Sequence, residues 1–480
     1  MRTTLSCRYG PYGRIGFVTR IAIIGGGPGG YEAALVAAQL GAKVTVIEQD
    51  GPGGACVLSD CVPSKTLIAT SVRKQALLDA ASLGVRFSGG PDGDAGHVLA
   101  DMPLVNRRVK ELARAQSEDI AKRLAAEGVD VIEGRGRLVD PQRIRVGDQT
   151  IRADVVIVAT GAHPRVLPGA EPDGERILTW RQLYDLDELP EHLIVVGSGV
   201  TGAEFAGAYR SLGSEVTLIS SRDRMMPNED ADAAEVLEAV YRRRGMNVLG
   251  RSRAASVRRT ADGVVVTLED GRVAEGTHCL MTVGMVPNTA GLGLEDNGIR
   301  LDRNGFIEVD KVSRTSAPGV YAAGDCTGVM MLASVAAMQG RIAVWHALGE
   351  AVEPIRLATV ASNIFTDPEI ASVGVTQRQV DSGQVDAKVV KLPLATNARA
   401  KMQGFLDGFV KLFCRPNTGI VLGGVVVAPR ASELILAVST AVRNRLTVDQ
   451  LAHTFAVYPS LSGSITEAAR RLMSREAAFL

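Results

Sequence analysis

Two glycine-rich segments contain the residues whose type and spacing most directly suggest chemistry. Each has the pattern GxGxxG, the first at Gly25, Gly27 and Gly30 and the second at Gly197, Gly199 and Gly202. In this pattern the first glycine permits a tight turn, the second lets the backbone approach a pyrophosphate, and the third packs a helix on a strand. A single GxGxxG could be purely structural, but two in register predict two dinucleotide sites.

The residue at the end of the next expected strand differs between the two copies. Glu48 and Ser220 occupy equivalent places after the two glycine patterns. An acidic residue here accepts hydrogen bonds from both ribose hydroxyls, so Glu48 predicts a ribose without a 2′-phosphate, as in FAD. Ser220 lacks the charge that would repel a 2′-phosphate, and Ser221, Arg222 and Arg224 follow it. We therefore predict NADPH at the second site, with NADH also possible; a solvated loop with scattered charge is the alternative.

A pair of cysteines follows the first copy. Cys56 and Cys61 lie in GGACVLSDCVPSK with four residues between them. Two close thiols beside a nucleotide site suggest a redox dithiol, and two buried cysteines are the alternative. Zinc would require more ligands nearby, and the sequence has none, so no metal site is predicted.

Strands and helices must position the glycines, Glu48 and the cysteines. An internal duplication in the sequence predicts where these strands and helices lie. The first copy begins at Ile21 with IAIIGGGPGGYEAALVAAQLGAKVTVIEQD, and the second begins at Leu193 with LIVVGSGVTGAEFAGAYRSLGSEVTLISSR. Each predicts a strand, a glycine loop, an alanine-rich helix and a second strand. Further buried strands are expected in RADVVIVATG, HCLMTVG and GVYAAGD, the last of which ends in Asp325. An Asp at a strand's carboxyl end can accept a hydrogen bond from a ribityl hydroxyl or cap the next helix.

The predicted fold class is α/β, with two Rossmann-like dinucleotide-binding domains and a C-terminal α+β dimerisation domain. The boundaries that we expect are a disordered extension at 1–18, an FAD-binding domain at 19–162 and 291–353, an NAD(P)-binding domain at 163–290, and an interface domain at 354–480. The basic, hydroxyl-rich first twenty residues also weakly resemble an organellar transit peptide.

Composition excludes several classes of function. The 480 residues include 53 Lys and Arg against 53 Asp and Glu, so there is no basic field for a nucleic-acid partner. No apolar run reaches the roughly 18 residues that a membrane span requires. Six cysteines in a chain of this length do not form a disulfide scaffold, so we predict a reducing, cytoplasmic location.

Together these motifs resemble the flavoprotein disulfide reductases, which include lipoamide dehydrogenase, glutathione reductase and mercuric reductase. The resemblance extends from about residue 18 to the end. It implies an FAD site formed by Gly25, Gly27, Gly30, Glu48, Gly54, Lys65, Thr160, Gly161 and Asp325. It also implies a nicotinamide dinucleotide site formed by Gly197, Gly199, Gly202, Ser220, Ser221 and Arg222.

The resemblance further implies roles for the candidate catalytic residues. Cys61 would be the flavin-side thiol and Cys56 the thiol that exchanges with substrate. Lys65 would form an ion pair with Glu204 near the flavin N5. A homodimer or higher homo-oligomer would form through the third domain.

The chain departs from the family in its closing motif, where a His before a Pro is followed by a Glu. The matching stretch here is YPSLSG, so Tyr458 replaces the His and Gly463 replaces the Glu. A phenol is a poor base at neutral pH, so Tyr458 is a weak candidate for the catalytic acid–base group. His453 and Glu467 lie nearby at the wrong spacing, and we expect both to have surface roles. The C-terminal REAAFL lacks the cysteine pair of mercuric reductase.

Within the family, the chain is similar to an actinobacterial lipoamide-dehydrogenase-like subgroup that acts as NAD(P)H:quinone reductases. The similar stretches are ILTWRQLYDL, ASVAAMQGR, TNARAKM and YPSLSGSITEAARRLM. Cys56 is a departure, because a member of that subgroup has Ala there. We therefore expect an FAD-dependent NAD(P)H:quinone reductase. The alternatives are dihydrolipoamide dehydrogenase or another disulfide reductase that uses Cys56 and Cys61, and a non-enzymatic FAD-bound subunit.

Overall fold

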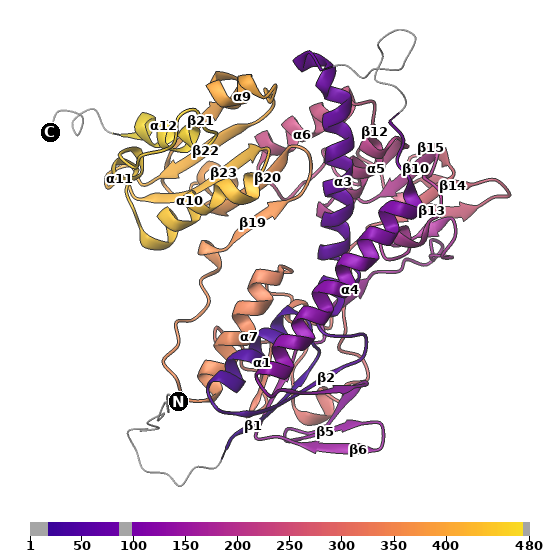
Figure 1. The fold of residues 1–480 in the computed structure, drawn as a ribbon, viewed down its shortest axis with the longest axis vertical. Helices are drawn as coiled ribbons and strands as arrows, with labels where there is room; N and C mark the ends of the chain where they lie inside the picture. The colour runs from indigo at the N-terminus through magenta and orange to yellow at the C-terminus, as the bar shows by residue number, and fades with distance from the viewer. Residues whose placement is uncertain (1–17, 86–97, 474–480) are drawn as a thin grey trace, which may run out of the picture. The chain divides into compact units, whose positions relative to one another are not determined.

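The computed structural model describes residues 18–85 and 98–473 (Figure 1). The predicted extension at 1–18 therefore lies, apart from Val18, outside the described residues. The chain divides into two compact units. Unit 1 comprises Met1–Gly54, Glu118–Gly161 and Pro287–Ile355, and unit 2 comprises Ala55–Ser117, Ala162–Val286 and Arg356–Leu480. The domain boundaries expected from the sequence remain predictions.

Unit 1 is built on a five-stranded parallel sheet. Its strand order is β18 (Val320–Ala322), β7 (Val155–Val158), β1 (Arg20–Ile24), β2 (Lys43–Glu48) and β3 (Asp130–Glu133). The helices α1 (Pro28–Gln39) and α7 (Ala333–Ala347) pack closely, since a Cβ on Gly340 would collide with the carbonyl of Gly29. A smaller antiparallel sheet contains β4 (Gly136–Asp140), β5 (Arg143–Val146) and β6 (Gln149–Arg152).

Unit 2 repeats the first pattern. Its parallel sheet has the order β12 (Asn247–Leu249), β11 (Glu215–Ile219), β10 (His192–Val196), β16 (His278–Met281) and β9 (Ile177–Leu178). The helix α5 (Val200–Leu212) follows β10 as α1 follows β1, and α3 (Cys61–Asp79) packs on α5. An antiparallel sheet of β13 (Ala254–Arg259), β14 (Val264–Leu268) and β15 (Val273–Gly276) adjoins this sheet. The predicted duplication of a dinucleotide-binding fold is confirmed.

The C-terminal part of unit 2 is a separate α+β layer. Its antiparallel sheet has the order β19 (Ala361–Ile364), β20 (Glu369–Gly374), β23 (Val421–Ala428), β22 (Phe409–Cys414) and β21 (Lys388–Pro393). Apolar side chains of α10 (Ala431–Asn444), α11 (Val448–Ala452) and α12 (Gly463–Leu472) share one core with this sheet. The predicted fold class is therefore confirmed.

Other helices, strands and turns lie between these elements in the sequence. They include α2 (Gly54–Leu58), α4 (Met102–Ala126), α6 (Ala231–Arg243), α8 (Gln377–Asp381) and α9 (Ala398–Met402), the short strands β8 (Ala162–Pro164) and β17 (Met285–Pro287), and the 3-10 turns η2 (Gln182–Asp185) and η4 (Asp325–Thr327). Within the described residues, no helix is both long enough and apolar enough to cross a membrane.

Candidate functional site

The first dinucleotide loop lies where four parallel strands of unit 1 end. Gly25 follows β1, Glu48 ends β2, Thr160 and Gly161 follow β7, and Asp325 follows β18. The carboxyl ends of parallel strands meet at one edge of a sheet, which is where ligands of such folds bind. The sheet therefore gathers these predicted FAD residues from four separate parts of the sequence.

The three glycines of the first loop differ in what a side chain at each position would meet. Gly25 has φ of +105°, and a Cβ there would collide with the carbonyl of Ala159, directly after β7. A Cβ on Gly30 would collide with the carbonyl of Gly25. A Cβ on Gly27 would meet only the carbonyl oxygen of Gly53, at 4.0 Å. The second glycine thus leaves space above the N-terminus of α1, which fits a pyrophosphate.

The Glu48 carboxylate holds the backbone of this loop through hydrogen bonds. Its carboxylate accepts hydrogen bonds from the backbone N–H of Gly26 at 2.5 Å and of Asp50 at 2.8 Å, and the side chain is buried. An ionised carboxylate has about four acceptor positions, so two remain for ribose hydroxyls. Gly54, with φ of +57°, lies against Gly27.

Thr160 is held by a residue that the sequence did not single out. Its hydroxyl donates to the carbonyl of Asn288 at 2.7 Å, and the Asn288 amide donates to the carbonyl of Thr160 at 2.8 Å. Two reciprocal bonds fix the backbone at the end of β7. No sequence motif marks Asn288, and only the fold brings it close to Thr160.

The second dinucleotide loop repeats these relations in unit 2. Gly197 has φ of +113°, and a Cβ there would collide with the carbonyl of Thr282, just after β16. A Cβ on Gly202 would collide with the carbonyl of Gly197, whereas a Cβ on Gly199 would meet nothing within 4 Å. The N-terminus of α5 therefore also has an open space in front of it, suited to a pyrophosphate.

Ser220 lies inside the loop that follows β11. Its side chain is buried, and its hydroxyl lies 2.7 Å from the Ser198 hydroxyl, accepts from the N–H of Arg222 and donates to the carbonyl of Arg224. A hydroxyl with these partners organises the loop from within. Ser221 and Arg222 beside it are exposed.

Arg251 is a basic residue near this loop that the sequence analysis missed. It follows β12, and its backbone N–H donates to the carbonyl of Arg222 at 3.0 Å. Its φ is +65°, a left-handed conformation that is uncommon for a residue with a side chain. The guanidinium is exposed and lies 3.3 Å from Asp223. Nothing in the local sequence indicates that Arg251 lies near Arg222, because the two residues follow different strands.

Cys56 and Cys61 are brought together by two consecutive helices, α2 and α3. The thiol of Cys61 is hydrogen-bonded with Cys56, and both cysteines are partly exposed. This hydrogen bond is the main reason that the pKa of Cys61 is lowered; burial and Asp60 act in the opposite direction, and Lys65 acts with it. The thiolate of Cys61 is thereby favoured, as a reactive cysteine requires.

Lys65 lies one helical turn after Cys61 and forms the implied ion pair. Its ammonium lies 2.8 Å from Glu204 in the second turn of α5, and Glu204 is 4% exposed. The other carboxylate oxygen of Glu204 accepts from the backbone N–H of Phe365 at 2.8 Å, and Lys65 lies 5.1 Å from the Phe365 ring centroid. Burial opposes the charge on Lys65, but Glu204 raises the lysine's pKa above its ordinary value.

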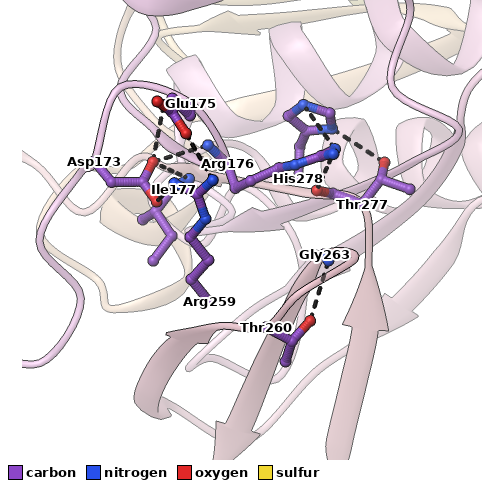
Figure 2. A network of polar contacts seen from close by, with 9 residues as sticks. All are labelled: Asp173, Glu175, Arg176, Ile177, Arg259, Thr260, Gly263, Thr277 and His278. Carbon is purple, nitrogen blue, oxygen red and sulfur yellow. Dashed lines mark hydrogen bonds and ion pairs between the residues drawn. The ribbon is translucent and has the colours of Figure 1, made fainter.

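A polar network lies at the start of β9 in unit 2 (Figure 2). The Asp173 carboxylate accepts from the backbone N–H groups of Glu175, Arg176 and Ile177, and Arg259 pairs with Glu175 at 2.6 Å. His278 lies in the same network, and burial together with Arg176 lowers its pKa to about 4. The network anchors the start of β9, after which come Arg181 and η2.

The closing motif does not provide an acid–base pair within the chain. The Tyr458 side chain is 85% exposed, and no described residue hydrogen-bonds its hydroxyl. Gly463 begins α12. His453 pairs with Asp449, and Glu467 pairs with Arg470 and Arg471, so both have the surface roles that we expected. In the described part of the chain, no cluster of His, Cys, Asp and Glu could hold a metal ion.

Comparison with known proteins agrees with this architecture. The family model described as pyridine nucleotide-disulphide oxidoreductase matches residues 19–340, and the dimerisation domain of that family matches residues 360–469. An NAD(P)H dehydrogenase (quinone) of Mycobacterium tuberculosis is 59% identical over 96% of this chain and 95% of the relative. A dihydrolipoyl dehydrogenase of Chlorobaculum tepidum is 35% identical over 94% of this chain and 96% of the relative.

A solved structure gives the same result. The crystal structure of LpdA from Mycobacterium tuberculosis has a TM-score of 0.90 and 60% identity, and the match covers 95% of this chain and all of that one. Both glycine loops and the cysteine helix lie within the matched residues of the oxidoreductase family model. This chain therefore belongs to the pyridine nucleotide-disulphide oxidoreductases, enzymes that use FAD and NAD(P).

Proposed function

We propose that this enzyme transfers reducing equivalents from NADPH, through FAD, to a quinone. One contrast carries the proposal: the Lys65–Glu204 ion pair is intact, whereas Tyr458 and Gly463 replace the acid–base pair for dithiol exchange. FAD bound at the first glycine loop would supply the group that accepts hydride. A quinone can take electrons from a reduced flavin without thiol exchange.

The residues of unit 2 have separate tasks in this proposal. The N-terminus of α5, open at Gly199, would bind the coenzyme pyrophosphate. Glu204, on the same helix, holds the Lys65 ammonium in place through a charge-assisted hydrogen bond. Coenzyme binding and the orientation of the lysine thus depend on one rigid element.

The preference for NADPH over NADH is also a proposal. Arg222 and Arg224 lie in the turn after β11, and Arg251 contacts this turn through its backbone N–H. We expect a 2′-phosphate on the adenosine ribose to lie at this turn. Ser220 keeps this turn in shape and adds no negative charge. Asp223 carries the opposing charge nearby, and its contact with Arg251 is exposed and therefore weak.

The relative of 59% identity supports the quinone as acceptor, because it is named an NAD(P)H dehydrogenase (quinone).

The matched dimerisation domain supports a homodimer, as do the exposed side chains of Phe455, Val457 and Tyr458 in that region. Apolar side chains exposed to this degree are typical of a surface that another chain covers. We propose a cytoplasmic location, because six cysteines in a chain of 480 residues do not form a disulfide scaffold and so suit a reducing compartment.

One observation favours a second candidate, a disulfide reductase such as dihydrolipoyl dehydrogenase. Cys56 and Cys61 are in hydrogen-bonding contact, as a redox dithiol requires. Relatives at lower identity are named dihydrolipoyl dehydrogenase.

Steady-state kinetics separate the two candidates. NADPH oxidation is measured with a panel of quinones, with lipoamide and with glutathione disulfide. We expect quinones to be reduced well and lipoamide poorly, since acid–base help to thiol exchange contributes about 10²–10⁴ in rate. Lipoamide turnover equal to that of the best quinone would reverse the assignment. Cys56→Ala should retain quinone reduction, and loss of it would mean that electrons leave through the dithiol.

A further inference from the structure

A charged cluster is buried where the C-terminal sheet meets the nucleotide-binding part of unit 2, and the proposed function leaves it without a task. Lys411 on β22 is 2% exposed, and its ammonium lies 2.8 Å from Asp230 and 2.5 Å from Asp232. Replacing a buried ion pair by apolar side chains often leaves stability unchanged, so stability alone gives little reason to keep one. The position of Asp230 in the fold points to what this lysine does.

Asp230 ends the loop that carries residues proposed to select the coenzyme. The segment 220–230, here called the coenzyme loop, follows β11 and contains Arg222 and Arg224. At its end the Asp230 carboxylate caps α6 by accepting from a backbone N–H of the first turn. Lys411 therefore binds one end of the coenzyme loop, while β11 holds the other.

The middle of the coenzyme loop contacts the second glycine loop. Met226 donates its backbone N–H to the carbonyl of Ser198 at 2.9 Å, and the hydroxyl of Ser198 lies 2.7 Å from that of Ser220. Ser198 lies between Gly197 and Gly199, just before α5. A shift of the coenzyme loop would therefore move the backbone that we propose to bind the pyrophosphate.

The conformation of Met226 depends on the groups around it. Its φ is +50°, a left-handed conformation that is uncommon for a residue with a side chain. The side chain is 2% exposed and belongs to the same apolar core as Phe409 and Phe413 of β22. The Lys411 ammonium lies 5.6 Å from the centroid of the Phe409 ring. One strand of the C-terminal sheet thus gives the coenzyme loop both a charged and an apolar support.

We infer that Lys411 is a positioning residue for the coenzyme: through Asp230 it fixes the coenzyme loop, and through that loop the N-terminus of α5. The inference rests on the proposed binding of NAD(P)H at the second glycine loop, but not on the acceptor or on which coenzyme is preferred. A loop that is already ordered loses less conformational entropy when its ligand binds, so the affinity is higher. Lys411 acts through the loop, because its ammonium is buried with the two carboxylates.

A double variant tests this role without leaving a buried charge alone. Lys411→Met combined with Asp230→Asn removes the ion pair, and asparagine remains a good helix cap. Asp232 keeps Lys391 as its partner, at 2.8 Å. The FAD-loaded enzyme is titrated with NADP⁺ and with NAD⁺, and turnover is measured with NADPH and NADH. We expect both Kd values and both KM values to rise about tenfold, the cost of ordering a few side chains, with kcat unchanged.

Lys391→Met is the matched control, since its side chain is 47% exposed and contacts Asp232 but not the helix cap. It should leave both affinities unchanged. Asp230→Asn alone, in which Asp232 still neutralises Lys411, is the milder variant and should shift both Kd values in the same direction. All titrations are made well below the melting temperature of each variant.

The outcomes separate the inference from the proposed function. Parental affinity for both coenzymes in the folded double variant, or in Asp230→Asn if the double variant does not fold, would overturn the inference. An equal loss of affinity in Lys391→Met would overturn it too. Failure of the parent enzyme to reduce quinones would instead contradict the proposed function and leave the effect of Lys411 on coenzyme affinity standing.

Discussion

The exposed arginines beside β11 should determine which coenzyme the enzyme prefers. A charge-assisted hydrogen bond contributes about 1.5–3 kcal/mol, roughly ten- to a hundred-fold in affinity. Arg222→Ala and Arg251→Ala should therefore each raise KM for NADPH by roughly this factor and leave KM for NADH nearly unchanged. Equal effects on the two coenzymes would remove both residues from the 2′-phosphate site. Arg272→Ala is a useful control, because Arg272 is already engaged by Asp270 and the carbonyl of Gly250.

At the same scale, the contact between the two thiols has a measurable consequence. The hydrogen bond from Cys56 is the largest contribution that lowers the pKa of Cys61. Cys56→Ala removes that bond, whereas Cys56→Ser keeps a donor in place. We expect the thiolate absorbance of Cys61 to appear at higher pH in the Ala variant than in the Ser variant. Coincident titrations would mean that Cys56 does not stabilise the thiolate.

At the scale of elements, the strand–loop–helix units separate glycines that the fold needs from glycines that a ligand needs. Gly202 packs α5 against the carbonyl of Gly197, so Gly202→Ala should lower the melting temperature and impair folding. Gly199 has open space around its missing Cβ, so Gly199→Ala should fold normally and bind NAD(P)H weakly. Thermal melting and coenzyme titration on both variants test the pair. Normal coenzyme affinity in Gly199→Ala would place the pyrophosphate elsewhere.

At the scale of the whole molecule, a buried ion pair joins the C-terminal sheet to the nucleotide-binding part of unit 2. Lys411 on β22 is 2% exposed and lies 2.8 Å from Asp230, which caps α6, and 2.5 Å from Asp232. Breaking such a pair by removing one partner costs about 3–5 kcal/mol, because a charge stays buried without its counter-ion. Lys411→Met should therefore lower the melting temperature markedly.

The neighbouring Lys391 provides the matched comparison. It also contacts Asp232, at 2.8 Å, but its side chain is 47% exposed. Exposed ion pairs contribute about 0–1 kcal/mol, so Lys391→Met should change the melting temperature little. Similar losses in the two variants would mean that burial does not distinguish the pairs.

Much of this protein followed from local sequence. The two glycine loops, their strands and helices, Glu48, and the α+β character after Pro354 were predictable, because periodicity and turn chemistry act over short stretches. Cys61 and Lys65 are four residues apart, so their proximity follows from helical spacing. Cys56 is close in sequence, but it lies on α2, and the junction of α2 and α3 brings the two thiols together.

The tertiary structure decided what depends on distant segments. It paired Lys65 with Glu204, joined Asn288 to Thr160 and set Arg251 beside Arg222. It buried the Ser220 side chain, whose hydroxyl makes hydrogen bonds with Ser198, Arg222 and Arg224. Such contacts arise when sheet order and helix packing bring together residues far apart in the chain, and the residue types at those positions carry no local sign of them.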